Sequence, residues 1–389
     1  MKVLKSFIIM ALLSVPFFSK AEDEEPKFKV APSARVLIDG GVYASPEKYL
    51  FKDGMAIPEA RVGAKMWYGK WSSWIDVGVA YGRVGLRNMW IQYDFNEHHL
   101  ARAGNFLQPF GYQGPTSANV KPTFEQPIAS ALFTPGLQLG GMYVFHNKNF
   151  YSATAFHVES SALTNVMNYP LFNQQGFTVM ERFVLRNKKA GVKDNPVIQA
   201  GISLSYSTPD RHLVDDYDIH QGFTNSANFP TRVNSVEAVG AVVGDAKNRF
   251  KLSPELVFSY KRLAFESQYF FQTISRKEGL KSFNSQSAYV NLRGILFGGN
   301  YGYDSTQAIL THPNKNALEC VLDYNYSTLS DAKAGIFGGR ANSFGITLSY
   351  YFNAYITARL NYTYTHTWDK FESLPLTQNA FQIRLMALF

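Results

Sequence analysis

Basic side chains recur on the polar faces of segments in which polar and apolar residues alternate. Arg61 and Lys65 lie in EARVGAKM, Arg359 lies in ITARLNYTYT and Arg384 lies in AFQIRLMALF. Lys and Arg side chains that face an enclosed aqueous space attract anions. The pattern therefore points first to the passage or binding of small anionic solutes.

Carboxylates share the same faces, so the lining of such a space would carry both positive and negative charges. The acids on these faces are Glu59, Asp76, Asp94, Glu255, Glu266, Glu319 and Asp323. One interpretation is that the charges pair between neighbouring segments and only stiffen the wall. Arg359 and Arg384 differ, because no acid lies on the same face of their own two segments. Our hypothesis is that these two arginines form part of a weakly anion-preferring surface.

Other chemistry has little support in the sequence. Gly-x-Ser-x-Gly, His-Glu-x-x-His, Gly-x-x-x-x-Gly-Lys and Gly-x-Gly-x-x-Gly are all absent. The adjacent pair His98 and His99 falls in a predicted turn, which favours a surface position over a metal site. We therefore expect no enzyme activity, no metal and no cofactor, although Ser and His side chains brought together from different strands stay open as an alternative.

Strict alternation identifies the elements that position these side chains. In SFGITLSYYF, Phe344, Ile346 and Leu348 share one face while Ser343 and Thr347 share the other. A period of two residues is that of a β-strand with one apolar and one polar face. Only three residues separate this segment from ITARLNYTYT, which predicts an antiparallel hairpin.

The alternating strands predict a membrane barrel in preference to a soluble sandwich. Aromatic residues make up 15% of the chain, and many end the apolar faces, as they do in the aromatic belts of outer-membrane barrels. No segment after residue 21 has an apolar run long enough to span a bilayer as a helix. The fold class expected is an all-β transmembrane antiparallel barrel of about sixteen strands; an exported β-sandwich remains the alternative.

The two ends of the chain support export to the outer membrane. Lys2 and Lys5, an apolar run and Ser19-Lys20-Ala21 predict a signal peptide over residues 1–21, which leaves a single barrel domain over 22–389. The last strand ends at Phe389, and a terminal aromatic residue resembles the signal read by the barrel assembly machinery. A single cysteine, Cys320, leaves no intramolecular disulfide. The net charge of +8 is scattered, so no nucleic-acid partner is expected.

Short and long connections alternate along the predicted strands, as they do in outer-membrane barrels. The third long connection, Leu107 to Pro135, follows the segment RAGNFLQPFG and contains only Lys121 and Glu125 as charged residues. Its five prolines limit its freedom, so we expect it to restrict solute size more than charge. Residues 208–247 are interpreted as a large external loop, although VNSVEAVGAVV within them could be a further strand.

RAGNFLQPFG resembles the Arg-x-Gly-x-Phe-x-x-Pro-Phe-Gly signature of the phosphate-selective porin O and P family. Further segments that resemble this family are EARVGAKMWYGKW, LAFESQYFFQ, ALECVLDYNYS and GGRANSFGITLSYYFNAYITARLNYTYTH. The resemblance implies a trimeric porin of sixteen strands whose third external loop folds into the channel. It also implies an anion path lined by basic residues.

The positions of this chain that would line such a path are Arg61, Lys65, Arg102, Lys121, Arg359 and Arg384. The chain also departs from the family pattern, because Asp323 precedes Tyr324 where the family usually has Arg. The loop returns as Pro135-Gly136-Leu137 where the family usually has Pro-Gly-Arg.

Together these features predict a bacterial outer-membrane porin for passive diffusion of small hydrophilic solutes, with a weak preference for phosphate-like anions. Its expected partners are outer-membrane lipid, its solutes, the assembly machinery and two further copies of the chain. The alternative is a non-conducting surface barrel whose external loops bind a partner.

Overall fold

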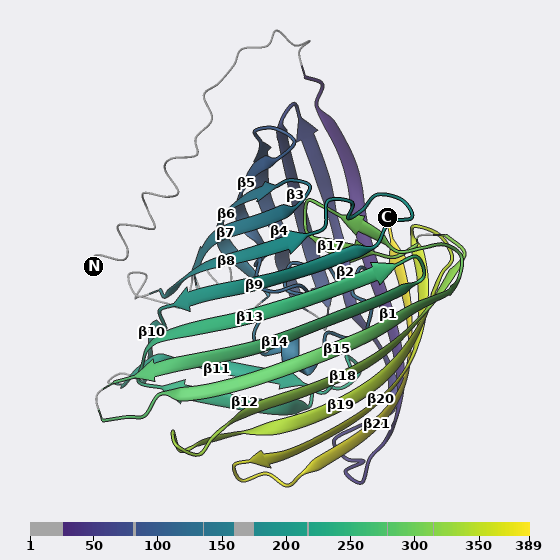
Figure 1. Ribbon diagram of the computed structural model, residues 1–389. Coiled ribbons are helices and arrows are strands. Elements are labelled where there is room, and N and C mark those ends of the chain that lie inside the picture. Colours follow the sequence, from purple (N-terminus) through teal and green to yellow (C-terminus); the bar gives the residue numbers. More distant parts are fainter. Residues whose placement is uncertain are drawn as a thin grey trace, which may run out of the picture.

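The chain folds into a closed barrel of antiparallel strands (Figure 1). The structure is a computed structural model that describes residues 26–80, 83–134, 136–158, 175–215, 218–277, 279–313 and 315–389. The expected signal peptide lies outside the described residues. So does most of the connection from Glu159 to Gly176, which the sequence predicts to be one of the long loops.

Sixteen strands make up the barrel, which confirms the expectation of about sixteen. In the order in which they pair, these strands are β1 (Lys29–Ala44), β2 (Gly54–Tyr68), β3 (Trp71–Ala80), β4 (Arg83–Asp94), β5 (His99–Leu107), β6 (Leu137–His146), β7 (Phe150–Val158), β8 (Phe177–Arg186), β9 (Val197–Ser207), β13 (Ala246–Tyr260), β14 (Leu263–Arg276), β15 (Phe283–Phe297), β18 (Ala317–Asp331), β19 (Ile336–Tyr351), β20 (Ile356–Lys370) and β21 (Leu376–Leu388).

The first and last strands close the barrel by pairing with each other. The Ala34 N–H donates to a main-chain oxygen of Phe389 at 2.8 Å, and the Phe389 N–H donates to the Ala34 carbonyl oxygen at 2.9 Å. The same pairing sets Asp39 opposite Arg384. A closed sheet has no free edge, and closure brings side chains from the two ends of the sequence together.

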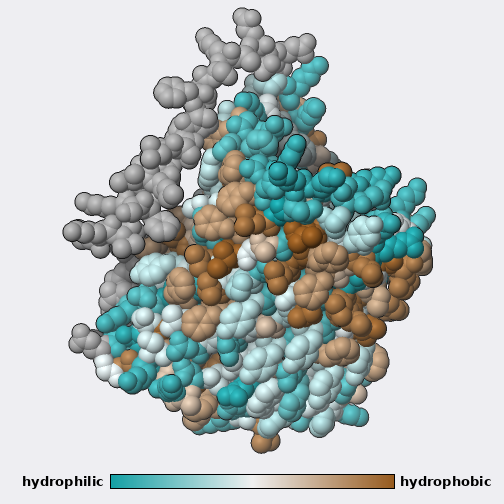
Figure 2. Space-filling view, viewed as in Figure 1, coloured by the Kyte–Doolittle hydropathy of each residue, from teal (hydrophilic) through white to brown (hydrophobic). Residues whose placement is uncertain are grey.

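Side chains alternate between the outer and the inner face of the wall, as the sequence pattern predicts. On β19, Phe344 is 45% exposed on the outer face, whereas Thr347 on the inner face is fully buried. Apolar side chains form a belt across the visible outer face, with hydrophilic residues at both ends (Figure 2). Within the described ranges, no helix is long and apolar enough to cross a membrane.

The segment after β5 crosses the interior of the barrel and contains the short helix α2 (Ile128–Ala131). Its Gly111 N–H donates to the Ser203 Oγ of β9 at 2.9 Å. From β13, Lys251 Nζ donates to the Phe133 carbonyl oxygen at 3.0 Å. We call residues 108–136 the inner loop.

A second insertion enters from the end of the barrel where β21 finishes. It is the hairpin of β16 (Gly302–Asp304) and β17 (Ile309–Thr311), which lies between β15 and β18. Arg182 of β8 donates to the carbonyl oxygens of Gln307 and Ala308 at 2.9 and 3.1 Å. The Leu310 N–H donates to the Tyr112 hydroxyl of the inner loop at 2.9 Å, so the two insertions meet.

Residues 208–247 form a separate sheet of β10 (Asp210–Asp215), β11 (Asp218–Asn228) and β12 (Glu237–Gly244). This sheet is not part of the barrel wall, in agreement with the interpretation of the region as a loop, although the stretch VNSVEAVGAVV does contain most of a strand, β12. The insert packs against inward-facing side chains of the wall, and Gln382 Nε2 of β21 donates to the Pro230 carbonyl oxygen at 3.0 Å. Apolar side chains of this insert, the inner loop and the wall share one buried cluster that includes Phe229, Phe133 and Phe270.

Candidate functional site

Exposure of the inward side chains differs around the wall. Arg182 on β8 and Arg359 on β20 are 0% and 1% exposed, because the insertions cover them. On β2 and β5, by contrast, Arg61 and Arg102 are partly exposed and Lys65 is exposed. The space that solvent reaches inside the barrel therefore lies along the strands near the N-terminus.

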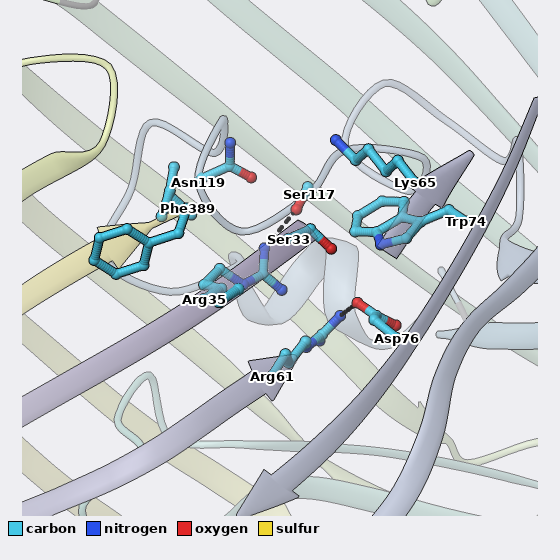
Figure 3. Close-up of a pocket in the computed structure, with 11 residues that line it drawn as sticks. Ser33, Arg35, Arg61, Lys65, Trp74, Asp76, Ser117, Asn119 and Phe389 are labelled. Atoms are coloured by element: carbon cyan, nitrogen blue, oxygen red, sulfur yellow. Dashed lines mark hydrogen bonds and ion pairs between the residues drawn. The ribbon is translucent and has the colours of Figure 1, made fainter. Parts of the chain in front are cut away.

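A pocket of about 160 Å³ opens on this side, between the wall and the inner loop. Its lining residues are Ser33, Ala34, Arg35, Arg61, Lys65, Trp74, Asp76, Ser117, Asn119, Leu388 and Phe389. Figure 3 shows the basic side chains and Trp74 around this space, with Ser117 and Asn119 of the inner loop across from the wall. Strands β1 to β3, the C-terminal end of β21 and the inner loop thus form one site.

Two of the pocket's arginines are tied to acids. Arg35 stands opposite Arg61 in the register of β1 and β2, and Glu59 lies between them, paired with Arg35 and 3.0 Å from Arg61 Nε. Arg61 Nη1 also lies 3.8 Å from Asp76 Oδ2. Arg35 Nη1 donates to the Ser117 hydroxyl at 2.6 Å, which ties the inner loop to the wall.

Lys65 and Arg102 lie against tryptophan rings. Lys65 Nζ is 4.8 Å from the Trp74 ring centroid, and the Arg102 guanidinium carbon is 4.2 Å from that of Trp90. The two rings meet edge to face at 6.4 Å, so Lys65, Trp74, Trp90 and Arg102 form what we call the cation–tryptophan row. Among the described residues, neither cation has a carboxylate within ion-pair distance. The attraction of a ring for a cation leaves the charge uncancelled.

Arg359 and Arg384 hold the inner loop instead of facing open solvent. Arg359 donates to the carbonyl oxygens of Thr123 and Lys121 at 2.9 and 2.8 Å. Arg384 donates to the Phe124 carbonyl oxygen at 2.6 Å and pairs with Glu125. We call these contacts the loop latch.

Asp39 corrects the hypothesis that no acid neutralises Arg384. Arg384 Nε and Nη2 donate to the two carboxylate oxygens of Asp39 at 2.7 and 2.6 Å. Asp39 lies on neither of the two segments that contain Arg359 and Arg384. Closure of the barrel brings its strand, β1, alongside β21. The interpretation that inward charges pair with one another also holds for Arg182 with Glu255 and for Arg293 with Glu319, both at 2.8 Å.

The charged side chains of the inner loop titrate differently from free residues. Burial lowers the pKa of Lys121 to about 8, despite the nearby Glu125 carboxylate. For Glu125, burial alone would raise the pKa, but Arg232 and Arg384 bring it down to about 2. Arg232 comes from the β11–β12 connection and lies 2.8 Å from Glu125. The latch is therefore ionised at neutral pH.

The structure brings only part of the predicted set into one site. Arg61 and Lys65 line the pocket, Arg102 lies farther along the cation–tryptophan row, and Lys121, Arg359 and Arg384 lie in or against the inner loop. The sequence reasoning missed Arg35, although continuing the alternation backward from Leu37 would have found it. It also missed Trp74 and Trp90 as inward residues, because aromatic side chains were expected on the outer belt.

Comparison with protein families decides the assignment. The family model described as phosphate-selective porin O and P matches residues 35–389. The chain belongs to this porin family. The protein is accordingly a channel protein of the bacterial outer membrane, and this agrees with the closed sixteen-stranded wall.

Solved structures share the fold of this porin at low sequence identity. A loop-deletion mutant of OmpT, an outer membrane protein of Vibrio cholerae, matches with a TM-score of 0.57, 10% identity, and coverage of 93% of this chain and 99% of that chain. The trimer form of in-vitro folded OmpT of Vibrio cholerae matches with a TM-score of 0.55 and 10% identity, and the match covers 93% of this chain and 99% of that chain. For the outer membrane channel DcaP of Acinetobacter baumannii, the TM-score is 0.52 and the identity 9%, with coverage of 93% of this chain and 97% of that chain. A comparison with curated proteins finds no match.

The porin departs from its family's pattern at a position that faces the interior. Asp323 of β18 is inward and only 9% exposed, where the family usually has a basic residue. In the part of the chain that the structure describes, no group of three or more His, Cys, Asp or Glu residues could hold a metal ion. Among the inward basic residues predicted from the wall strands, those on β2 and β5 are the ones that keep contact with solvent.

Proposed function

We propose that this porin is a passive, non-enzymatic channel with a weak preference for small anions, and that solutes move along the inner faces of β1 to β5. The observation that carries the proposal is the pair Lys65 and Arg102, whose charges are held by Trp74 and Trp90 rather than cancelled by acids. Rings and rows of fixed cations at a narrow point favour anions. The acid-paired arginines add much less to this preference.

Planar bilayers test this proposal directly. Purified protein should produce discrete conductance steps, and the reversal potential in a KCl gradient should have the sign of a chloride-preferring channel. Because the inner loop and the β16–β17 hairpin fill much of the barrel, we expect a conductance below that of an open barrel of sixteen strands. A purified, folded barrel that gives no conductance would support the surface-barrel alternative instead.

We further propose that the porin acts as a homotrimer. Glu181 lies on the outer face of β8, between Val179 and Phe183, which are 38% and 39% exposed. Its carboxylate accepts a hydrogen bond from Ser152 at 2.7 Å and another from Thr154. A carboxylate in the apolar belt is costly when it faces lipid, so cover by another protein surface favours assembly. Native mass spectrometry of detergent-purified protein should show trimers; monomers alone would contradict this.

A further inference from the structure

We propose that the pocket beside Trp74 is a binding subsite for small aromatic carboxylates. The inference deepens the proposed function, because it names the solute class for the same channel. It rests on three observations: the size of the pocket, an unsatisfied indole N–H, and a cation that is free of acids.

The size of the pocket suits one ring. Its volume is about 160 Å³, and a protein cavity of about 150 Å³ accepts a benzene molecule. The inner loop sets one boundary through Ser117 and Asn119, while β2 and β3 set the other. A monocyclic solute fits this space, whereas a disaccharide does not.

The indole nitrogen of Trp74 lacks a partner. Its Nε1 is buried and has no hydrogen-bond partner among the described residues, although a buried indole N–H normally finds one. The nitrogen edge of the ring is turned toward the middle of the pocket (Figure 3). A carboxylate oxygen in the pocket would satisfy this donor after a small rotation of the ring, because the nitrogen itself is not accessible to solvent.

Lys65 supplies the charge for the same carboxylate. Its ammonium group lies over the Trp74 ring and forms no ion pair among the described residues. Arg35 and Arg61 also line the pocket, but Glu59 and Asp76 already engage them. A single carboxylate can therefore bind Lys65 and the indole N–H together, with Arg35 and Arg61 as more distant cations.

Trp74 distinguishes an aromatic acid from other anions. A flat ring attached to the carboxylate can contact the indole surface of Trp74, and aromatic contacts of this kind increase affinity about tenfold. Inorganic phosphate and acetate have no such surface. A sugar acid would need several hydrogen-bond acceptors, but Asp76 is already bonded to Asn88 Nδ2 through both of its oxygens at 3.2 Å.

Calorimetric titration of the detergent-purified full-length protein with benzoate, acetate, phosphate and galacturonate tests the inference. We expect benzoate to bind about tenfold more tightly than acetate. Trp74→Leu should remove that difference, and Trp74→Phe should restore part of it. Trp71→Leu is the matched control, because Trp71 is on the same strand but faces outward. This variant should bind benzoate and acetate with the wild-type affinities. Lys65→Gln should weaken every anion.

Equal affinity for benzoate and acetate, or tighter binding of phosphate or galacturonate than of benzoate, would overturn the inference. Benzoate selectivity that survives Trp74→Leu would also overturn it. Calorimetry does not require conduction, so the two proposals can fail separately. If the protein conducts but does not bind benzoate more tightly than acetate, only this inference is wrong. If it binds benzoate selectively but does not conduct, only the proposed function is wrong.

Discussion

Inward cations of this porin fall into two groups at the scale of single residues. Arg182, Arg293 and Arg384 are buried against carboxylates, which compensates the cost of removing a charge from water but cancels its field. Lys65 and Arg102 are stabilised by tryptophan rings instead. The number of inward basic residues is therefore a poor guide to selectivity, and the partner of each cation matters more.

We expect Lys121 to add a small, pH-dependent contribution to the anion preference, beside the larger one of Lys65 and Arg102. Burial lowers the pKa of Lys121 to about 8, so its positive charge is present below pH 8 and is lost as the pH rises through that value. The reversal potential should thus shift toward zero between pH 7 and 9, with a midpoint near 8. Lys121→Gln should remove this step.

Lys148→Gln provides the control for that measurement, because Lys148 lies in an exposed turn. The Lys148→Gln variant should show the same shift of the reversal potential between pH 7 and 9 as the wild type. A wild-type reversal potential that stays constant between pH 7 and 9 would contradict the prediction.

At the scale of elements, the inner loop depends on the latch at Arg384. Arg384→Gln would leave Asp39 and Glu125 buried beside each other without their shared cation. Loss of one partner of a buried pair costs about 3–5 kcal/mol, so we expect a mobile loop with larger current fluctuations. Single-channel noise analysis measures this effect.

Arg340→Gln is the matched control for the latch variant. Arg340 pairs with Asp369 at 2.9 Å at the rim, where both side chains are partly exposed, and such pairs contribute about 1 kcal/mol or less. Its current should resemble the wild type. If the current of the Arg384→Gln variant fluctuates no more than that of the control, the latch does not hold the loop.

The β16–β17 hairpin is the second element that narrows the channel. Replacing residues 301–312 by a short Gly-Ser turn removes the contacts with Arg182 and Tyr112, and the single-channel conductance should rise. Shortening the exposed connection at residues 371–375 is the control, because it joins β20 to β21 at the other end of the barrel from the hairpin. An unchanged conductance after the first replacement would mean that the hairpin lies outside the conducting path.

The elements of the wall could be predicted from sequence because one period governs them. Most strands repeat the alternation of SFGITLSYYF, so the number of strands and the separation of residues 208–247 from the wall follow from local pattern. The packing of these residues against the interior does not. The hairpin insertion could not be predicted in this way, since Ile309 and Leu310 are buried by the distant Tyr112. The pairing of Asp39 with Arg384 likewise depends on closure, which joins the two ends of the sequence.

At the scale of the whole molecule, the pairing of β1 with β21 completes the barrel. Phe389 exchanges two backbone hydrogen bonds with Ala34, and we propose that its ring also acts as an assembly signal. Deletion of Phe389 should lower the yield of assembled barrel in the outer membrane, as measured by the heat-modifiable band on unheated gels. Phe389→Tyr keeps the ring and should retain most of the yield. Normal assembly of the deletion variant would contradict the proposed role.

The reversal potential of the Lys65→Gln, Arg102→Gln double variant tests the central claim most directly. In a tenfold KCl gradient, wild-type protein should prefer chloride, and the double variant should lose most of that preference while it still conducts. Arg359→Gln, which removes a loop contact rather than a solvent-accessible charge, should lose much less. Cation preference in the wild type, or full anion preference in the double variant, would contradict the account.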